Sequence, residues 1–199
     1  MVHQKQWLLC GCVSAMLVLP APALAQGSAQ NRQQTAAPAR ANSTQAGAPQ
    51  AALAKLAGEY DRIIKFVGQT GAMVAPSSGA CKISVVLGGR FILEESTDTV
   101  FGHAVEGLRI YGYNNATQQY EMARMYTMST AITMMKGTSS DGGKTIDYTG
   151  ETETSGTGAA PMHAQLRQID DDHFVVTLST TGPDGKETPF QETDYSRKK

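Results

Sequence analysis

The sequence has very few cysteines. Only Cys10, Cys12 and Cys81 occur in 199 residues, and the first two lie in an N-terminal apolar segment. Removal of that segment would leave Cys81 alone, so the mature chain could form no intramolecular disulfide and would depend on its core for stability. No sequence signature supplies a base that could activate a nucleophilic thiol. We therefore expect Cys81 to be a small buried or half-buried residue.

An excess of charge is also absent. The chain has 17 basic and 18 acidic residues, a net charge of −1, and the basic residues form no stripe. This distribution argues against nucleic acid as a partner. The sequence also contains no nucleophile elbow, phosphate-binding loop or zinc-ligand spacing, so we expect no cofactor and no metal.

The N-terminal segment is typical of a secretory signal peptide. Lys5 provides a positive start, residues 7–19 are apolar apart from Ser14, and residues 23–25 form a small-x-small cleavage pattern. The apolar run of roughly 13 residues is shorter than the ~20 that a transmembrane helix needs. We expect cleavage after Ala25, a periplasmic or secreted protein, and no transmembrane segment in the mature chain. The alternative is lipoprotein processing at residues 9–12, but that motif precedes most of the apolar run.

The next segment, residues 26–52, predicts a disordered linker of low complexity. Residues 26–50 contain no aromatic residue and no Leu, Ile or Val, so they cannot bury enough surface to offset the entropy of ordering. Residues 51–57 are good helix formers and predict a helix of about two turns that ends at Gly58. The folded domain is expected to span residues 53–199.

From Gly58 onward the apolar pattern has a period close to two, which predicts strands. The breaks between them contain turn sequences, such as Gly88-Gly89, Asn114-Asn115 and the run Asp170–Asp172. The predicted strands are 59–67, 80–87, 90–97, 105–114, 119–128, 131–138, 144–154, 161–169, 173–180 and 187–195.

This succession of strands predicts an all-β fold. No helix of useful length fits between the strands, which excludes parallel βαβ architecture. Short connections make sequence neighbours spatial neighbours, and a sheet of about ten strands tends to curl and close. We expect an antiparallel up-and-down barrel or half-barrel of the calycin or lipocalin type, with a short N-terminal helix. A β-sandwich is the alternative.

Short motifs in a characteristic order resemble a known family. They are Leu56-Ala57-Gly58-Glu59-Tyr60, Leu87-Gly88-Gly89-Arg90-Phe91 with Glu94-Glu95, Gly112-Tyr113-Asn114-Asn115 with Tyr120, Gly150-Glu151, Asp171-Asp172-His173, residues 181–187 and Tyr195-Ser196-Arg197-Lys198. Together they resemble the bacterial family named domain of unknown function 1579, over residues 53–199. The resemblance implies a lipocalin-like β-barrel and carries no established activity.

One hairpin, around residues 114–119, allows its cross-strand register to be predicted. If Tyr113 faces Tyr120, then Arg109 faces Arg124, and one face of the hairpin carries a mixed aromatic and cationic set: Arg109, Tyr111, Tyr113, Tyr120, Met122, Arg124 and Tyr126. The other face carries Glu106, Leu108, Ile110, Ala123, Met125 and Thr127. Opposed like charges destabilise a sheet and need a counter-charge, especially where they are buried.

Two interpretations of this face remain open. The seven residues could line a barrel lumen that binds a small molecule with an apolar or aromatic body and an acidic group. Alternatively, Arg109 and Arg124 could lie on the outer surface or pair with Glu94, Glu95 or Glu151. The methionines and the run Asp170–Asp172 suggest copper and calcium, but neither shows the ligand spacing of such a site, so core packing and a solvated turn explain them better.

The sequence therefore favours an exported small-molecule binding module. The first alternative is a structural or interaction protein of the cell envelope. The second is a barrel enzyme that uses an acid/base pair of carboxylates drawn from Glu94, Glu95, Asp98, Glu151 and Glu153. No catalytic residue is assigned.

Overall fold

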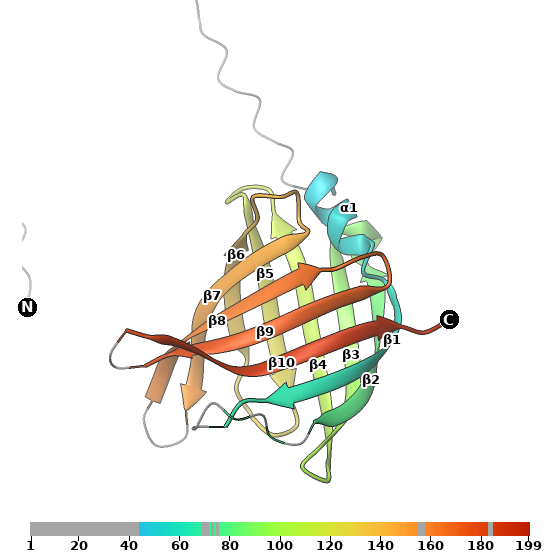
Figure 1. Cartoon of the computed structure of the whole chain (residues 1–199). Helices are drawn as coiled ribbons and strands as arrows, with labels where there is room; N and C mark the ends of the chain where they lie inside the picture. The colour runs from blue at the N-terminus through green and yellow to red at the C-terminus, as the bar shows by residue number, and fades with distance from the viewer. Residues whose placement is uncertain (1–43, 69–71, 73, 75, 155–157, 183–184) are drawn as a thin grey trace, which may run out of the picture. The chain divides into compact units, whose positions relative to one another are not determined.

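The computed structural model describes residues 44–68, 72, 74, 76–154, 158–182 and 185–199. These residues form one short helix and ten antiparallel strands that close into a barrel (Figure 1). The elements are α1 (Ala48–Ala54), β1 (Gly58–Phe66), β2 (Ser77–Val86), the 3-10 turn η1 (Leu87–Gly89), β3 (Phe91–Val100), β4 (His103–Asn114), β5 (Gln119–Tyr126), β6 (Thr133–Thr138), β7 (Thr145–Thr154), β8 (Gly158–Gln168), β9 (His173–Thr181) and β10 (Glu187–Arg197). The expected signal peptide (residues 1–25) and the linker up to residue 43 lie outside the described residues.

The predicted up-and-down barrel is confirmed, and every predicted strand is present. Each strand pairs with its neighbours in sequence, and β1 pairs with β10 from Phe66↔Gln191 to Tyr60↔Arg197. This last pairing distinguishes a closed barrel from the half-barrel and from the sandwich. Closure leaves no strand edge without a partner, which removes the most common route to edge-to-edge aggregation.

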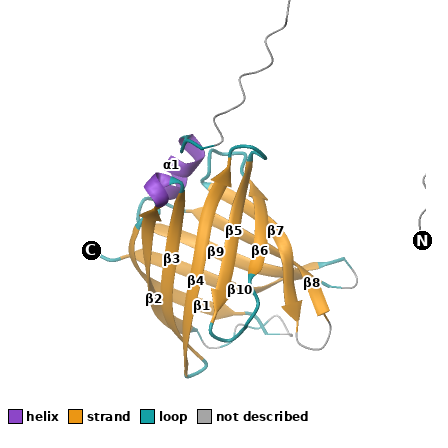
Figure 2. Ribbon diagram, turned by 180° about the vertical axis from the view of Figure 1, so that it is seen from behind, coloured by secondary structure: helices purple, strands orange, loops and turns teal. Residues whose placement is uncertain are grey.

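The helix begins at Ala48 rather than at the predicted residue 51. Pro49 lies in its first turn, where a proline costs no hydrogen bond, and the side-chain Oε1 of Gln50 accepts a hydrogen bond from the Gly47 N–H at 2.9 Å. The Gln50 side chain also donates to the Tyr113 carbonyl oxygen at 2.9 Å. Figures 1 and 2 show α1 lying across one end of the barrel. Within the part of the chain that the structure describes, no helix has the length and apolar character needed to span a bilayer.

The barrel interior is layered along its axis. The half next to α1 holds a large apolar core that includes Leu53, Leu56 and Cys81, all buried. A smaller apolar cluster of Ile64, Val100 and Val105 lies toward the other end. Charged side chains separate these two apolar regions and form the candidate site described below.

Gly137 on β6 shows how tightly the main core is packed. It pairs with Tyr148 on β7, and the ring of Tyr148 lies over it. A Cβ atom at position 137 would lie 2.7 Å from Cδ1 of Tyr148 and 2.8 Å from the carbonyl oxygen of Asp147. Only glycine allows the buried ring and the β7 backbone to come this close.

We expect Gly137→Ala to lower the free energy of unfolding by about 2 kcal/mol, because the added methyl group forces the ring or the backbone to move. Urea denaturation followed by circular dichroism measures the change. Thr138→Ala, at the exposed position next in sequence, is the matched control and should change stability by less than about 0.5 kcal/mol. Equal effects of the two substitutions would contradict the close contact.

Candidate functional site

The charged side chains between the two apolar regions, here called the charged layer, are centred on the predicted hairpin of β4 and β5. The predicted register is confirmed, because Tyr113 pairs with Tyr120 and Arg109 pairs with Arg124. On the neighbouring strand, Glu94 pairs with Arg109. Three inward charged residues therefore lie in one row across β3, β4 and β5.

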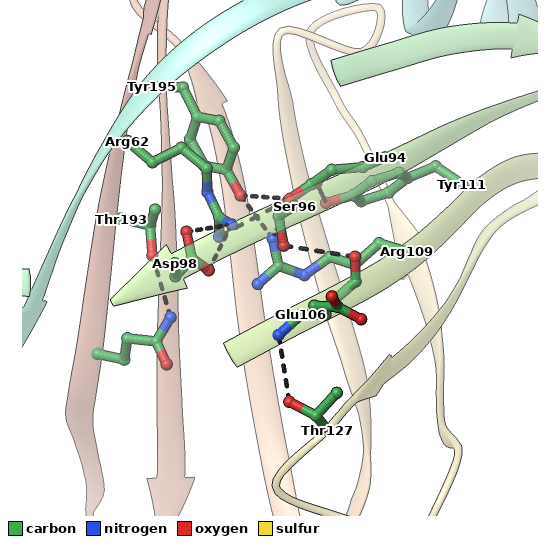
Figure 3. A network of polar contacts seen from close by, with 12 residues as sticks. Arg62, Glu94, Ser96, Asp98, Glu106, Arg109, Tyr111, Thr127, Thr193 and Tyr195 are labelled. Atoms are coloured by element: carbon green, nitrogen blue, oxygen red, sulfur yellow. Dashed lines mark hydrogen bonds and ion pairs between the residues drawn. The ribbon is translucent and has the colours of Figure 1, made fainter. Parts of the chain in front are cut away.

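Glu94 is the common counter-charge of this layer, and it is only 1% exposed. Its Oε1 accepts hydrogen bonds from Nη1 of Arg109 at 2.7 Å and from the Tyr195 hydroxyl at 3.0 Å. Its Oε2 accepts one from the Tyr111 hydroxyl at 3.1 Å. Arg62 on β1 approaches the same carboxylate at 3.8 Å (Figure 3). One buried carboxylate thus connects strands β1, β3, β4 and β10.

A second row lies across β1, β2 and β3. Arg62 pairs with Gly79, and Gly79 pairs with Asp98. Because Gly79 has no side chain, Arg62 reaches past it, and its Nη1 donates to both Asp98 carboxylate oxygens at 2.9 and 2.7 Å. A Cβ atom at position 79 would lie 2.0 Å from Oδ1 of Asp98. Arg62 and Asp98 can therefore form this ion pair only because residue 79 is a glycine.

The ionisation of Glu94 and Arg109 follows from their pairing. Burial alone would raise the pKa of Glu94, but Arg109, Arg62 and the hydroxyls of Tyr195 and Tyr111 outweigh it and lower that pKa. Burial would likewise lower the pKa of Arg109, but the Glu94 carboxylate outweighs it and raises the pKa well above its usual value. Burial raises the pKa of both tyrosine hydroxyls, so they remain neutral hydrogen-bond donors. Both members of the Glu94–Arg109 pair are charged at neutral pH.

Arg124 differs from the other two inward arginines. Its guanidinium carbon lies 4.6 Å from the ring centroid of Tyr126, and within the described residues it has no carboxylate partner. Burial, together with repulsion from Arg109, lowers the pKa of Arg124 to about 10. Arg124 therefore carries a half-buried positive charge at neutral pH without a matching anion among the described residues.

A cavity of about 350 Å³ lies on the side of the charged layer away from α1. Its inner end is polar, with Arg62, Asp98, Arg109 and Arg124 among the lining residues. Its walls are mostly apolar, and include Ile64, Phe66, Val100, Val105, Tyr126 and Phe190. Phe101 in the β3–β4 turn and Met128 in the β5–β6 loop line its outer part and are 59% and 62% exposed. The cavity therefore has a cationic floor and an apolar mouth.

The structure divides the seven predicted site residues into two groups. Arg109, Arg124 and Tyr126 line the cavity. The other four point inward on the α1 side of the charged layer: Tyr111, Tyr120 and Met122 are buried in the main core, and Tyr113 packs against it. The hydroxyl of Tyr111 supports Glu94, and the rings of Tyr113 and Tyr120 pack edge to face with centroids 4.9 Å apart.

Arg62 and Tyr195 are the residues that sequence reasoning missed. The sequence does indicate that Arg62 points inward. Tyr60, Arg62 and Ile64 lie on the same face of the strand, so Arg62 is a charged residue at a position where the pattern places a buried one. Of the predicted partners of the arginines, Glu94 is the one found, and it pairs with Arg109. Glu95 and Glu151 are exposed.

The floor of the cavity carries more cationic than anionic side chains among the described residues. Of the described residues that line it, Asp98 alone carries a carboxylate, and no histidine is present. Nor does any group of three His, Cys, Asp or Glu side chains in the described ranges have an arrangement suited to a metal ion. Asp170 accepts hydrogen bonds from the Asp172 N–H and contacts His173, as in a simple turn.

A closed ten-stranded antiparallel barrel with a cavity at one end defines the class of small lipocalin-like β-barrel domains. A family described as "protein of unknown function (DUF1579)" matches residues 45–197, and the chain belongs to this family. The crystal structure of Rv2717c from M. tuberculosis is similar with a TM-score of 0.53 at 15% identity, covering 77% of this chain and 99% of that one. This likeness supports the barrel fold alone. No curated protein matches the chain.

We expect Glu94→Gln to lower the free energy of unfolding by about 3–5 kcal/mol at neutral pH, because it leaves two buried arginines with too little negative charge. The pKa of Glu94 is lowered in the folded state, so its stabilising effect is present above the unfolded-state pKa and is lost as the pH falls through the folded-state value. The stability difference between wild type and Glu94→Gln should therefore shrink below pH about 4.5. Thermal unfolding of both proteins across this pH range measures it, and a pH-independent difference would contradict the buried ion pair.

Proposed function

We propose that this barrel binds a small molecule with an apolar or aromatic body and one acidic group. The observation that carries the proposal is Arg124, a half-buried cation at the floor of a cavity with no carboxylate partner among the described residues. Burying an unmatched charge costs stability, and a bound anion would offset that cost. The acidic group would lie against Arg124, with the body of the ligand against Phe66, Val105 and Phe190.

The charge balance of the inner cavity supports the same conclusion. Three arginines, Arg62, Arg109 and Arg124, face two carboxylates, Glu94 and Asp98, so one positive charge is in excess among the described residues. In addition, Nε of Arg62 is buried and makes no hydrogen bond within the described part of the chain. A single excess charge favours a monoanion over a dianion. The cavity volume of about 350 Å³ lies within the range of small-molecule pockets.

The fluorescent aryl sulfonate 8-anilinonaphthalene-1-sulfonate tests this proposal, since it combines an aromatic body with one acidic group. We expect its fluorescence to rise on saturable binding to the wild type, and 4-phenylbutyric acid, but not 4-phenylbutyramide, to displace it. Arg124→Met should weaken binding about tenfold or more, because a charge-assisted hydrogen bond is lost. The same substitution should raise the melting temperature of the ligand-free protein by a few degrees, because it removes an unmatched charge.

Arg167→Met is the matched control, since Arg167 is an exposed arginine of β8 that does not line the cavity. It should leave both the affinity and the melting temperature unchanged. Wild-type affinity in Arg124→Met, or equal displacement by the acid and the amide, would overturn the proposed site.

We also propose that the protein is exported, on the basis of the signal-like residues 1–25 and the cleavage pattern that ends at Ala25. Expression of the full chain in a bacterium, followed by fractionation and intact mass measurement, tests this. We expect a periplasmic protein whose mass corresponds to a chain that begins at Gln26. Retention of residues 1–25, or a lipid-modified cysteine, would contradict cleavage at this position.

A further inference from the structure

The outer wall of the barrel is polar over most of its circumference. Strands with one buried and one solvated face normally alternate apolar and polar residues. Most outward positions of β1, β7, β8 and β10 follow this rule, with Asp61 and Lys65, Asp147 and Thr149, His163 and Gln165, and Glu192 and Asp194, none of them buried; Ile63 on β1 is an isolated exception.

The outer face of β4, β5 and β6 departs from this rule. It carries a group of apolar side chains, Leu108, Ile110, Ala123, Met125 and Met134, which with Ile132 just before β6 are here named the outer apolar patch. The cross-strand register joins them, since Leu108 pairs with Met125 and Ala123 pairs with both Ile110 and Met134. Leu108 and Ile110 are 41% and 38% exposed, and Ile132 and Met134 are 61% and 59% exposed.

The same strands carry charge on their inner face. Arg109 and Arg124 point into the barrel from positions directly adjacent to Leu108, Ile110, Ala123 and Met125. At the row of Arg109 and Arg124 the wall is therefore charged on the inside and apolar on the outside, the reverse of the usual polarity. Exposed apolar side chains contribute little to the stability of an isolated barrel, and here they are contiguous and have a polar border.

Acidic residues dominate the border of the patch. Two shallow grooves extend from it, one lined by Leu108 and Met125 together with Glu95 and Glu106, the other by Ile132 and Met134 together with Glu121, Lys136 and Glu151. Among the described residues that line the two grooves there are four carboxylates and one lysine, and Lys82 on β2 pairs with Glu95 beyond them. A complementary partner needs an apolar centre and a basic periphery.

This border and the size of the patch narrow the choice of partner. A second copy of the chain would bring the acidic borders of two patches together, and an anionic lipid surface would be repelled. Three strands spaced about 4.8 Å apart, with two rows of side chains, cover on the order of 200 Å². A stable dimer buries about 800 Å² on each partner, so the patch suits a short segment better than a whole domain.

We propose that the outer apolar patch binds a short protein segment whose apolar side chains are flanked by Lys or Arg. The apolar residues of the segment cover Ile110 and Met134, and its basic residues lie near Glu106 and Glu151. Leu108 and Met125 of the patch also line the cavity, but Ile110, Met134 and Glu106 do not, so substitutions at these three positions test the patch independently of the cavity.

Two short synthetic peptides test the proposal with the full chain. Both have the same core of alternating Leu and Thr, and one is flanked by Lys while the other is flanked by Glu. Fluorescence anisotropy of the labelled peptides should show about tenfold tighter binding of the Lys-flanked peptide, weakened by added salt. Ile110→Thr and Met134→Thr should each lower its affinity about fivefold or more, and Glu106→Gln should reduce its salt dependence.

Ile63→Thr is the matched control, because Ile63 lies on β1, outside the patch, and is 50% exposed. It should bind the Lys-flanked peptide as tightly as the wild type does. Three results would overturn the proposal: equal binding of both peptides or of neither, a dimer in analytical ultracentrifugation that Ile110→Thr dissociates, or sedimentation with phosphatidylglycerol vesicles that Ile110→Thr abolishes.

Discussion

The Glu94 carboxylate makes it possible for Arg62 and Arg109 to be buried inside a barrel whose core is mostly apolar. It is approached by Arg62 from β1, by Arg109 from β4 and by the Tyr195 hydroxyl from β10. Charges removed from water need partners of opposite sign, and here a single anion serves groups from three other strands. The layering of the interior follows from this position: a sealed core lies on the α1 side, and a cavity with a cationic floor lies on the other.

Arg124 is the one inward arginine that this arrangement leaves unmatched among the described residues. It stands next to Arg109 in the ladder, and the Glu94 carboxylate is already shared. A charge in this position costs stability in the empty barrel, and under the proposed function a bound anion would offset that cost. Such a conflict between stability and binding is a common property of functional sites. Arg62, by contrast, is paired with Asp98 in the neighbouring row, and Gly79 makes room for this pair.

The fold was largely predictable from the sequence, because the turn residues between strands and the period of two are local signals. The register of β4 and β5 was also predictable, since a short hairpin around Asn114 leaves few ways to align its strands. From the sequence, Glu94 was only one of three carboxylates that could pair with Arg109. The roles of Arg62 and Tyr195 depend on contacts across the closed barrel, which no local pattern encodes. The start of α1 was misplaced because the side-chain contacts of Gln50 were not anticipated.

The contacts of Glu94 join the first and last strands of the barrel, and this affects the order in which the strands are expected to pair during folding. The Glu94–Arg109 pair can form early, within one hairpin, whereas Tyr195 is separated from Glu94 by 101 positions and arrives only with the last strand. Closing so large a loop is entropically costly, so we expect the seam between β1 and β10 to form late in the folding of this barrel. Because Tyr195 completes the hydrogen bonds of Glu94, we expect closure of the barrel and burial of the ion network to occur in one cooperative step.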